Sequence, residues 1–547
     1  MSRHFSELAC TAAMSASLLL AGCAPTEISS STSEVSQAQL RGHIEFLAAD
    51  SLKGRDTGSV GYQVAADYVA AEFSKLGLKP AGNSGSYFQE VPLVEARRVK
   101  GSAGVTLHTS GGDVVLQFPQ QFTMRPDLVE ASQQLTADLV FVGYGIVADE
   151  YDHDDYRGLE VEGKIAVMLT GRPQSWPTEE GAHLGSGRQK ARYAAEHGAV
   201  GRIIVHTPRD EKVFPYEENF PYLDVPRMNW LDGTGKPDAY WPQLQGDAFL
   251  NLDAAAELFA GAPTPLEEIY QADTEGKPVR GFELPGAATL SRQSSHRKLS
   301  SPNIVAVLEG SDPKLKQEYL VYSAHLDHLG VIKGENGEDD IYNGAMDNAA
   351  GIAIMLETAR ALQQQPLKRS VLFVAVTGEE KGLLGAGYYA RNPTVPRDAM
   401  VANINLDMPV LVFPFADVIA FGADHSNLKS TVEKAAHQAG ITLTPDPMPE
   451  QAIFVRSDHY RFVQQGIPAI YLATGFTSKN PEENGEVLWQ KFNKEHYHQA
   501  SDQADLPIDY ESAAIFTQIN INIGRDICNQ EQRPAWNEGD FFGRAFN

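Results

Sequence analysis

The sequence predicts an α/β protein in which helices flank a mostly parallel mixed sheet, with a second, β-rich α+β domain inserted into it. Residues 319–322, 371–376 and 469–472 are unbroken apolar runs, which is typical of strands buried on both faces. Between the first two runs, residues 348–364 carry apolar side chains at helical spacing. Buried strands that alternate with helices predict a sheet covered by helices on both sides.

The N-terminal part of the chain reads as helix followed by short strands. Residues 40–80 have a helical pattern that closes at Gly77 and Pro80, and residues 105–125 alternate in the manner of strands. A chain of 547 residues is too long for one ordinary hydrophobic core, so we expect more than one domain.

The middle of the chain has a different pattern of expected secondary structure. Residues 139–142, 165–169 and 203–205 resemble strands, and an alanine-rich segment at 191–198 resembles a helix between the last two. The expected boundaries are 40–128 and 296–535 for the two parts of the α/β domain, 129–295 for the insert and 536–547 for a C-terminal tail.

The first residues resemble an export signal. Arg3 precedes an apolar run at residues 8–21, which is shorter than the roughly 20 residues that a membrane span needs. Leu20-Ala21-Gly22-Cys23 resembles the lipobox of bacterial lipoproteins, which implies a signal peptide at 1–22 and a lipid on Cys23. An ordinary secretory signal or an uncleaved anchor is the alternative.

Two further features concern the exported protein. The Ser- and Thr-rich residues 23–39 predict a flexible tether, and Ala24 after the cysteine favours the outer membrane, facing the periplasm or the exterior. Cys528 then has no internal partner for a disulfide. The 45 basic and 71 acidic residues give a formal charge of −26, which argues against nucleic acid as a partner.

Polar side chains that suit a metal follow the predicted strands. In α/β sheets, ligands bind at the carboxyl ends of the strands. Imidazole and carboxylate together suit zinc and related ions, and water on such an ion becomes a nucleophile near neutral pH. The candidates at strand ends, before the helix at 348 and near the C-terminus are His325, Asp327, His328, Asp347, Glu379, Glu380, Asp407, His496, His498 and Asp502.

The adjacent Glu379 and Glu380 suggest a division of labour. Neighbouring side chains on an extended segment point in different directions, so one can bind metal while the other acts as a base. Each motif alone is weak, and Asp347 suits the N-cap of its helix equally well.

Together the motifs resemble metallopeptidase family twenty-eight, the aminopeptidase S and aminopeptidase Y family of zinc exopeptidases, which have a phosphorylase/hydrolase-like fold. His-x-Asp, Gly-Ala-Met-Asp-Asn, Gly-Glu-Glu, Asn-x-Asp-Met and Tyr-His occur in the family's order, and residues 50–91 resemble its opening. The segment 194–201 is similar to a protease-associated domain, which either shapes access to the site, binds partners or is a passive insertion.

The resemblance implies a role for each matching residue. It gives two zinc ions as cofactors: His325 and Asp407 on one, Glu380 and His498 on the other, and Asp347 as the bridge. Glu379 is then the general base, Asp327 orients His325, and Tyr497 and Arg456 steady the substrate. His496 and His459 are alternatives for the last ligand.

The expected function is removal of N-terminal residues from peptides or proteins. A carboxypeptidase or a glutaminyl cyclase on the same fold and a non-catalytic surface receptor are the alternatives. Serine or cysteine catalysis has no matching motif, because the sequence lacks a Gly-x-Ser-x-Gly elbow and Cys528 stands alone.

Overall fold

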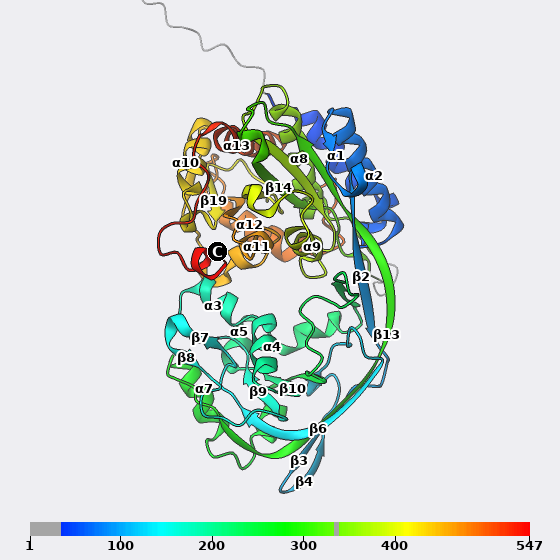
Figure 1. Ribbon diagram of the computed structural model, residues 1–547, viewed down its shortest axis with the longest axis vertical. Helices are drawn as coiled ribbons and strands as arrows, with labels where there is room; N and C mark the ends of the chain where they lie inside the picture. The colour runs from blue at the N-terminus through cyan, green and yellow to red at the C-terminus, as the bar shows by residue number, and fades with distance from the viewer. Residues whose placement is uncertain (1–33, 333–338, 547) are drawn as a thin grey trace, which may run out of the picture. The chain divides into compact units, whose positions relative to one another are not determined.

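A computed structural model describes residues 34–332 and 339–546 (Figure 1). The described residues from Val35 onward form one compact unit. The predicted signal peptide, Cys23 and most of the predicted tether lie outside the described residues. Helix α1 (Gln37–Leu47) already begins inside the segment expected to be a tether, with the side chain of Ser36 as its N-cap. Val35 is only 3% exposed, so the packed structure begins before the predicted end of the tether at residue 39.

The central sheet is mostly parallel, as the sequence predicts. Strand β14 pairs in parallel with β17 and β18, and β18 pairs in parallel with β21. The sheet is mixed because β13 runs antiparallel to β17, and β19 antiparallel to β21. These strands are β13 (Phe282–Leu308), β14 (Tyr319–His325), β17 (Ser370–Val376), β18 (Met400–Asn405), β19 (Asp417–Phe421) and β21 (Ala469–Thr474).

Helices cover both faces of this sheet, which explains the unbroken apolar runs. In β17, Phe373 packs into the core with α2 (Val60–Lys75), α8 (Ala350–Leu362) and α13 (Tyr510–Asn529). Its neighbour Val374 packs on the opposite side with α9 (Leu384–Arg391) and α11 (His459–Val463). Successive side chains of a strand point to opposite faces, so both faces must be apolar. No helix within the described ranges is long and apolar enough to span a membrane.

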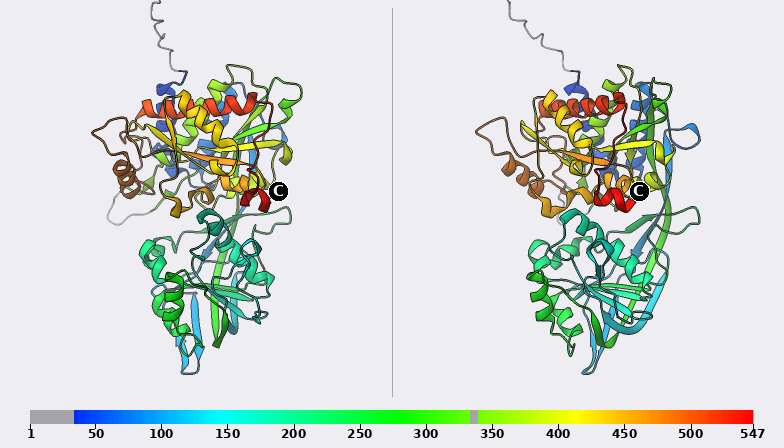
Figure 2. Two further views of the ribbon diagram at one scale, coloured as in Figure 1. Left: turned by 90° about the vertical axis from the view of Figure 1, so that its left-hand side faces the viewer. Right: turned by 60° about the vertical axis from the view of Figure 1, so that its left-hand side comes forward.

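The insert has a second sheet and its own core. Its strands β6 (Ser132–Phe141), β9 (Ile165–Leu169), β10 (Gly201–Val205) and β12 (Gly246–Leu250) pair in parallel from β6 to β12. Figure 2 shows helices of the insert, drawn in teal and green, against this sheet. The sequence predictions for 139–142, 165–169 and 203–205 are therefore confirmed as strands.

The insert begins earlier than residue 129. Strands β3 (Gly104–Thr109) and β5 (Phe122–Thr123) belong to the insert's sheet, since β3 pairs with the first part of β13 and β5 with β12. Val105 and Phe122 are fully buried in the insert's core. The alternating pattern identifies strands correctly, but a pattern with period two does not reveal which sheet a strand joins.

Strand β13 belongs to both sheets. It pairs with β6 and β3 in the insert, then with β2 (Phe88–Arg98), and finally with β17 in the α/β domain (Figure 1). The two sheets thereby form one hydrogen-bonded network of 17 strands.

The C-terminal tail is part of the packed structure. It ends in helix α14 (Phe541–Phe546), whose Phe541 and Phe542 are buried. Phe542 packs edge-on against the ring of His183, from α3 (Thr178–Leu184) of the insert, and also against Tyr460 of the α/β domain.

His425 joins the same three parts of the chain by ion pairs. Its Nε2 lies 2.6 Å from Glu179 of the insert, and its Nδ1 lies 2.6 Å from Asp540 of the tail. Burial alone would lower the pKa of His425, but the two carboxylates raise it to about 9.

We predict that this contact weakens in alkaline solution. A pKa raised above the unfolded value means that the stabilisation is complete below about pH 6.5 and is lost as the pH rises through about 9. Replacing His425 with Gln should lower the free energy of unfolding by on the order of 2 kcal/mol at pH 6 and by much less at pH 10. Urea unfolding of both proteins across this range measures the difference, and parallel pH profiles would contradict the prediction.

Candidate metal centre

The candidate residues meet at one edge of the central sheet. His325 is the last residue of β14, Glu380 lies in the turn after β17, and Asp407 follows β18 by two residues. Because these three strands are parallel, their carboxyl ends share an edge. Asp347 comes from the turn before α8, and His498 follows α12 (Gly485–Glu495).

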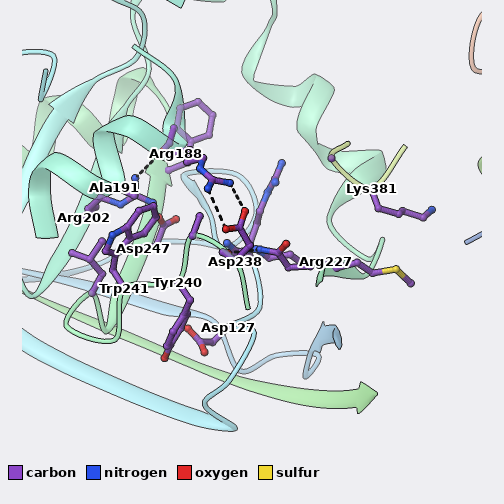
Figure 3. A pocket seen from close by; sticks show the side chains of 18 of the residues that line it. Asp127, Arg188, Ala191, Arg202, Arg227, Asp238, Tyr240, Trp241, Asp247 and Lys381 are labelled. Carbon is purple, nitrogen blue, oxygen red and sulfur yellow. Dashed lines mark hydrogen bonds and ion pairs between the residues drawn. The ribbon is translucent and has the colours of Figure 1, made fainter. Parts of the chain in front are cut away.

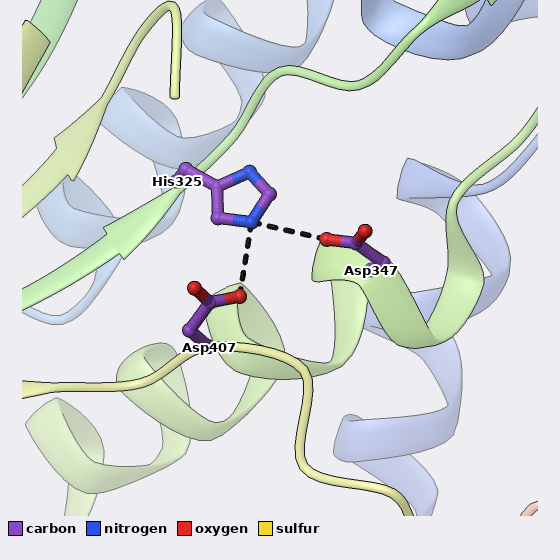
Figure 4. Close-up of side chains that lie close together, drawn as sticks. All are labelled: His325, Asp347 and Asp407. Atoms are coloured by element: carbon purple, nitrogen blue, oxygen red, sulfur yellow. Dashed lines mark hydrogen bonds and ion pairs between the residues drawn. The ribbon is translucent and has the colours of Figure 1, made fainter. Parts of the chain in front are cut away.

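One group of potential ligand atoms consists of His325, Asp347 and Asp407. Nε2 of His325 lies 3.1 Å from Oδ1 of Asp347 and 3.1 Å from Oδ1 of Asp407 (Figure 4). All three residues are buried, and the ligand atoms of the group lie within 4.8 Å of one another.

A second group shares Asp347. Nε2 of His498 lies 3.3 Å from Oδ2 of Asp347 and 3.3 Å from Oε2 of Glu380. The two oxygens of the Asp347 carboxylate therefore face two different imidazoles. The structure brings all five predicted ligands together, with Asp347 between the two groups.

The electrostatics of this centre favour a cation. Burial would lower the pKa of His498, but Asp347 and Glu380 raise it to about 10. Burial also raises the pKa of Glu379 well above its usual range, and Asp407 and Glu380 add to the effect. The carboxylates that attract a proton to an imidazole would equally attract a metal ion. Two imidazoles and three carboxylates are a donor set that suits zinc.

His328, a candidate to which the family resemblance assigns no role, also reaches this centre. It is completely buried, and its Nδ1 lies 2.7 Å from Oε1 of Glu380 and 3.9 Å from Oδ2 of Asp347. The ligand atoms of His328, Asp347 and Glu380 also lie within 4.8 Å of one another, so His328 could join Glu380 and the bridging Asp347 in holding an ion. Its position three residues after His325 was the only indication in the sequence that His328 lies near the centre. The spacing of residues along the chain does not reveal its contact with Glu380, because that contact joins two different loops.

The two alternative histidines lie elsewhere. His496 bonds to Ser501 through Nδ1, and His459 is buried against the rings of Phe454 and Tyr471. Burial lowers the pKa of His459 to about 3. In the described part of the chain, neither imidazole lies within ion-pair distance of a carboxylate of the centre.

Asp327 supports His325 differently from the expectation. Nδ1 of His325 lies 3.1 Å from the main-chain oxygen of Asp327, not from its carboxylate. The buried carboxylate instead accepts from the main-chain N–H groups of Glu379 at 3.1 Å and Glu380 at 3.4 Å, and from the hydroxyl of Thr57 at 3.0 Å. Asp327 therefore fixes both the ligand loop and the turn that carries the two glutamates.

A buried guanidinium fixes the loops on the other side. Arg55 is 1% exposed and donates to the main-chain oxygens of Leu326 at 2.8 Å, Asn343 at 2.6 Å and Gly344 at 3.0 Å, and also to that of Leu47. These oxygens lie in α1 and in the loops that bear His325 and Asp347. Burial lowers the pKa of Arg55 to about 10, so it stays charged at neutral pH.

Two further polar residues hold single ligands. The carboxylate of Asp502 accepts from the N–H of Met346 at 2.9 Å and of Asp347 at 3.0 Å. The hydroxyl of Ser457 donates to Oδ2 of Asp407 and accepts from Nδ2 of Asn405 at 2.8 Å. Such partners orient ligands and usually matter nearly as much as the ligands themselves.

The two predicted substrate residues differ in placement. The ring of Tyr497 stacks on that of His498, with 3.9 Å between their centres. Arg456 is exposed and donates to Gln451 at 3.2 Å. Within the described residues, no carboxylate of the centre lies in ion-pair range of Arg456.

The fold and the centre define a class: an α/β protein with buried histidine and carboxylate ligands at the carboxyl edge of its sheet. Residues 303–523 match the model of peptidase family M28, and residues 132–230 match that of the PA domain. The α/β domain at residues 303–523 is thus that of peptidase family M28, and the insert at residues 132–230 is a PA domain, as the motifs predict.

Curated relatives agree with this family. Aminopeptidase Y of Saccharomyces cerevisiae is 28% identical over 199 residues, which are 35% of this chain and 33% of that protein. Aminopeptidase YwaD of Bacillus subtilis is 28% identical over 153 residues, which are 26% of this chain and 31% of that protein. The matches thus span about a third of each relative.

The similarity in fold extends further than the similarity in sequence. An aminopeptidase from Aneurinibacillus sp. strain AM-1 superposes with a TM-score of 0.53 at 19% identity, covering 91% of this chain and 96% of that one. The mixed sheet with flanking helices and an insert is therefore shared between the two proteins.

We predict that replacing Asp327 with Asn weakens metal binding. The amide is uncharged and presents one oxygen in place of two to the N–H groups of Glu379 and Glu380, so Glu380 is held less firmly. Loss of such a partner costs about 10- to 100-fold in metal affinity. Competition for Zn²⁺ with a coloured chelator measures it, with the exposed Asp253→Asn as the matched control. Equal affinity in both variants would contradict this role of Asp327.

Proposed function

We propose that this protein is an aminopeptidase that hydrolyses N-terminal peptide bonds with the help of two zinc ions. The observation that carries the proposal is the position of Asp347, whose Oδ1 faces His325 and whose Oδ2 faces His498. One carboxylate between two sets of ligands is the arrangement that a pair of ions needs. The names of aminopeptidase Y and aminopeptidase YwaD support the substrate class.

The ligands divide into two sets around this bridge. His325 and Asp407 would hold one ion, and Glu380 and His498 the other. When bound, such ions supply an activated water and polarise the scissile carbonyl. The ligating imidazoles must be neutral, so zinc would replace the proton that the carboxylates now attract to His498.

Glu379 is the proposed general base and acid. Its main-chain N–H is fixed by the Asp327 carboxylate, and its neighbour Glu380 is committed to the second ligand set. In the proposed reaction the Glu379 carboxylate takes a proton from the attacking water and returns it to the nitrogen of the leaving amine.

Tyr497 is the proposed donor to the oxyanion. Its ring is held against His498, and burial together with Asp347 and Glu380 raises the pKa of its phenol. The hydroxyl therefore keeps its proton across the physiological range and can donate a hydrogen bond to the developing negative charge. The surrounding carboxylates favour a free ammonium group on the substrate, which would restrict cleavage to N-termini.

We predict that replacing Glu379 with Gln leaves two zinc ions per chain but lowers kcat by about 10²- to 10⁴-fold, the usual contribution of a general base. Metal content by atomic spectroscopy and turnover of aminoacyl reporter substrates measure the two effects, with Glu196→Gln on the insert as control. A variant with normal kcat would remove Glu379 from the mechanism.

The same assay separates the alternatives. An aminopeptidase should cleave C-amidated peptides, leave N-acetylated ones intact and lose activity with a chelator. Cleavage of N-acetylated but not C-amidated peptides would identify a carboxypeptidase. A single bound ion with cyclisation of N-terminal glutamine would identify a glutaminyl cyclase, and absence of both metal and turnover would indicate a receptor.

We also propose that the protein is exported and anchored by a lipid on Cys23 to the cell envelope, most simply to the outer membrane. The lipobox-like Leu20-Ala21-Gly22-Cys23 supports this proposal. Replacing Cys23 with Ser should shift the protein from the membrane to the soluble fraction after cell lysis, and abolish incorporation of a labelled fatty acid. Unchanged lipid labelling in the variant would contradict the proposed anchor.

A further inference from the structure

A basic hollow lies beside the turn that carries Glu379 and Glu380. It encloses about 630 Å³, within the size range of ligand sites. Most of its lining comes from the insert, and the α/β domain contributes Lys381, Gly382, Leu384 and Arg461 (Figure 3). Lys381 and Gly382 directly follow the two glutamates, so the hollow and the metal centre share one turn of chain.

The charge of this hollow is opposite to that of the whole protein. Its lining has an excess of four positive charges, whereas the chain has a formal charge of −26. The seven basic side chains are Arg125, Arg188, Arg202, Arg227, Arg292, Lys381 and Arg461, and the three acidic ones are Asp127, Asp238 and Asp247.

Each of the three aspartates forms an ion pair with one of the arginines. Arg188 pairs with Asp238, Arg202 with Asp247, and Arg292 with Asp127 at 3.0 Å. Figure 3 shows the forked contact between Arg188 and Asp238.

Three other guanidinium groups lack such a partner. Within the described residues, no carboxylate lies within 4 Å of Arg125, Arg227 or Arg461. Arg227 donates to the main-chain oxygen of Pro126 at 3.3 Å, and Arg461 to that of Gly382 at 3.0 Å. Arg125 and Arg227 are solvent-exposed, so an incoming ligand can reach them.

Neighbouring groups show the positive potential of the hollow. Burial alone would raise the pKa of Asp247, but Arg202, Arg292 and Arg227 lower it. The site therefore already favours negative charge.

We propose that this hollow binds carboxylates of the peptide substrate downstream of its N-terminus, so that the enzyme prefers acidic peptides. The proposal rests on the proposed aminopeptidase function. Guanidinium groups bind carboxylates through paired hydrogen bonds. In this proposal, a peptide whose N-terminus lies at the metal centre continues past the turn that carries Lys381 and Gly382 into the hollow. Trp230, Tyr240 and Trp241 in the lining offer apolar surface for the rest of the chain.

A carboxylate ligand fits better than a nucleic acid. A long polyanion would be repelled by the net charge of the protein, whereas a short acidic segment experiences mainly the local field of the hollow. Lys381 and Gly382 line the hollow and directly follow Glu379 and Glu380, so a substrate bound at the metal centre lies near the hollow.

The test compares peptides that match in length and N-terminal residue and carry either Asp and Glu or Asn and Gln at the downstream positions. The native enzyme should favour the acidic member by roughly tenfold in kcat/KM, mainly through KM, and less at high salt. The double variant Arg125→Gln, Arg227→Gln should lose this preference, while a single-residue aminoacyl reporter is cleaved as before. Arg280→Gln, an exposed site on the insert outside the hollow, is the matched control.

Direct binding separates this proposal from the proposed function. Calorimetric titration of the zinc-loaded Glu379→Gln enzyme with the acidic peptide should show tighter binding than with the neutral one, and the arginine double variant should abolish the difference. Equal kcat/KM for both peptides, with the reporter still cleaved, would overturn the proposal that the hollow binds carboxylates. The proposed aminopeptidase function would be unaffected. A protein that cleaves no peptide but binds the acidic one through these arginines overturns the function alone. Displacement by inorganic phosphate or a nucleotide, without discrimination between the peptides, overturns the assignment to carboxylates.

Discussion

The geometry of the metal centre depends on one buried cation. The guanidinium of Arg55 binds main-chain oxygens from α1 and from the loops that carry His325 and Asp347. A guanidinium at 1% exposure must satisfy its N–H groups mainly inside the protein, and here main-chain carbonyls of the loops accept from it. The charge of Arg55 also offsets part of the repulsion among Asp327, Asp347, Glu380 and Asp502, whose negative charges act on it. The N-terminal segment thereby stabilises ligands that lie hundreds of residues later.

The strands and the ligands were predictable from the sequence for a specific reason. Runs such as 371–376 are apolar on both faces, so their identity does not depend on contacts with other segments. Because parallel strands end at one edge, Asp407 and Glu380 could be expected to meet without knowing the loops between them. The family resemblance then assigned the pairs, and the structure brings all five ligands together.

The failures have a common physical origin: each involves a contact between segments that are distant in sequence. The carboxylate of Asp327 bonds to the N–H groups of Glu379 and Glu380, whereas the simpler expectation linked it to His325. His328 contacts Glu380 because two loops fold towards each other. Strand β3 belongs to the insert because it pairs with the first part of β13. The alternating pattern of residues 105–125 does not reveal this partner.

The insert and the α/β domain are joined at several independent places. His425 and Phe542 connect them through ion pairs and aromatic packing, and the basic hollow has walls from both. The arginines of the insert and the turn that follows Glu379 and Glu380 line the same space.

The continuity of β13 restricts how the gene for this protein can change. Ser294 pairs with Arg98 and Ile304 with Phe88, and the strand then continues beside β17 without a break. Adding or deleting one codon in this region would turn every side chain beyond it to the opposite face of one sheet. Length variation among descendants of this chain should therefore collect in the loops of the insert, while the shared strand keeps its residue count.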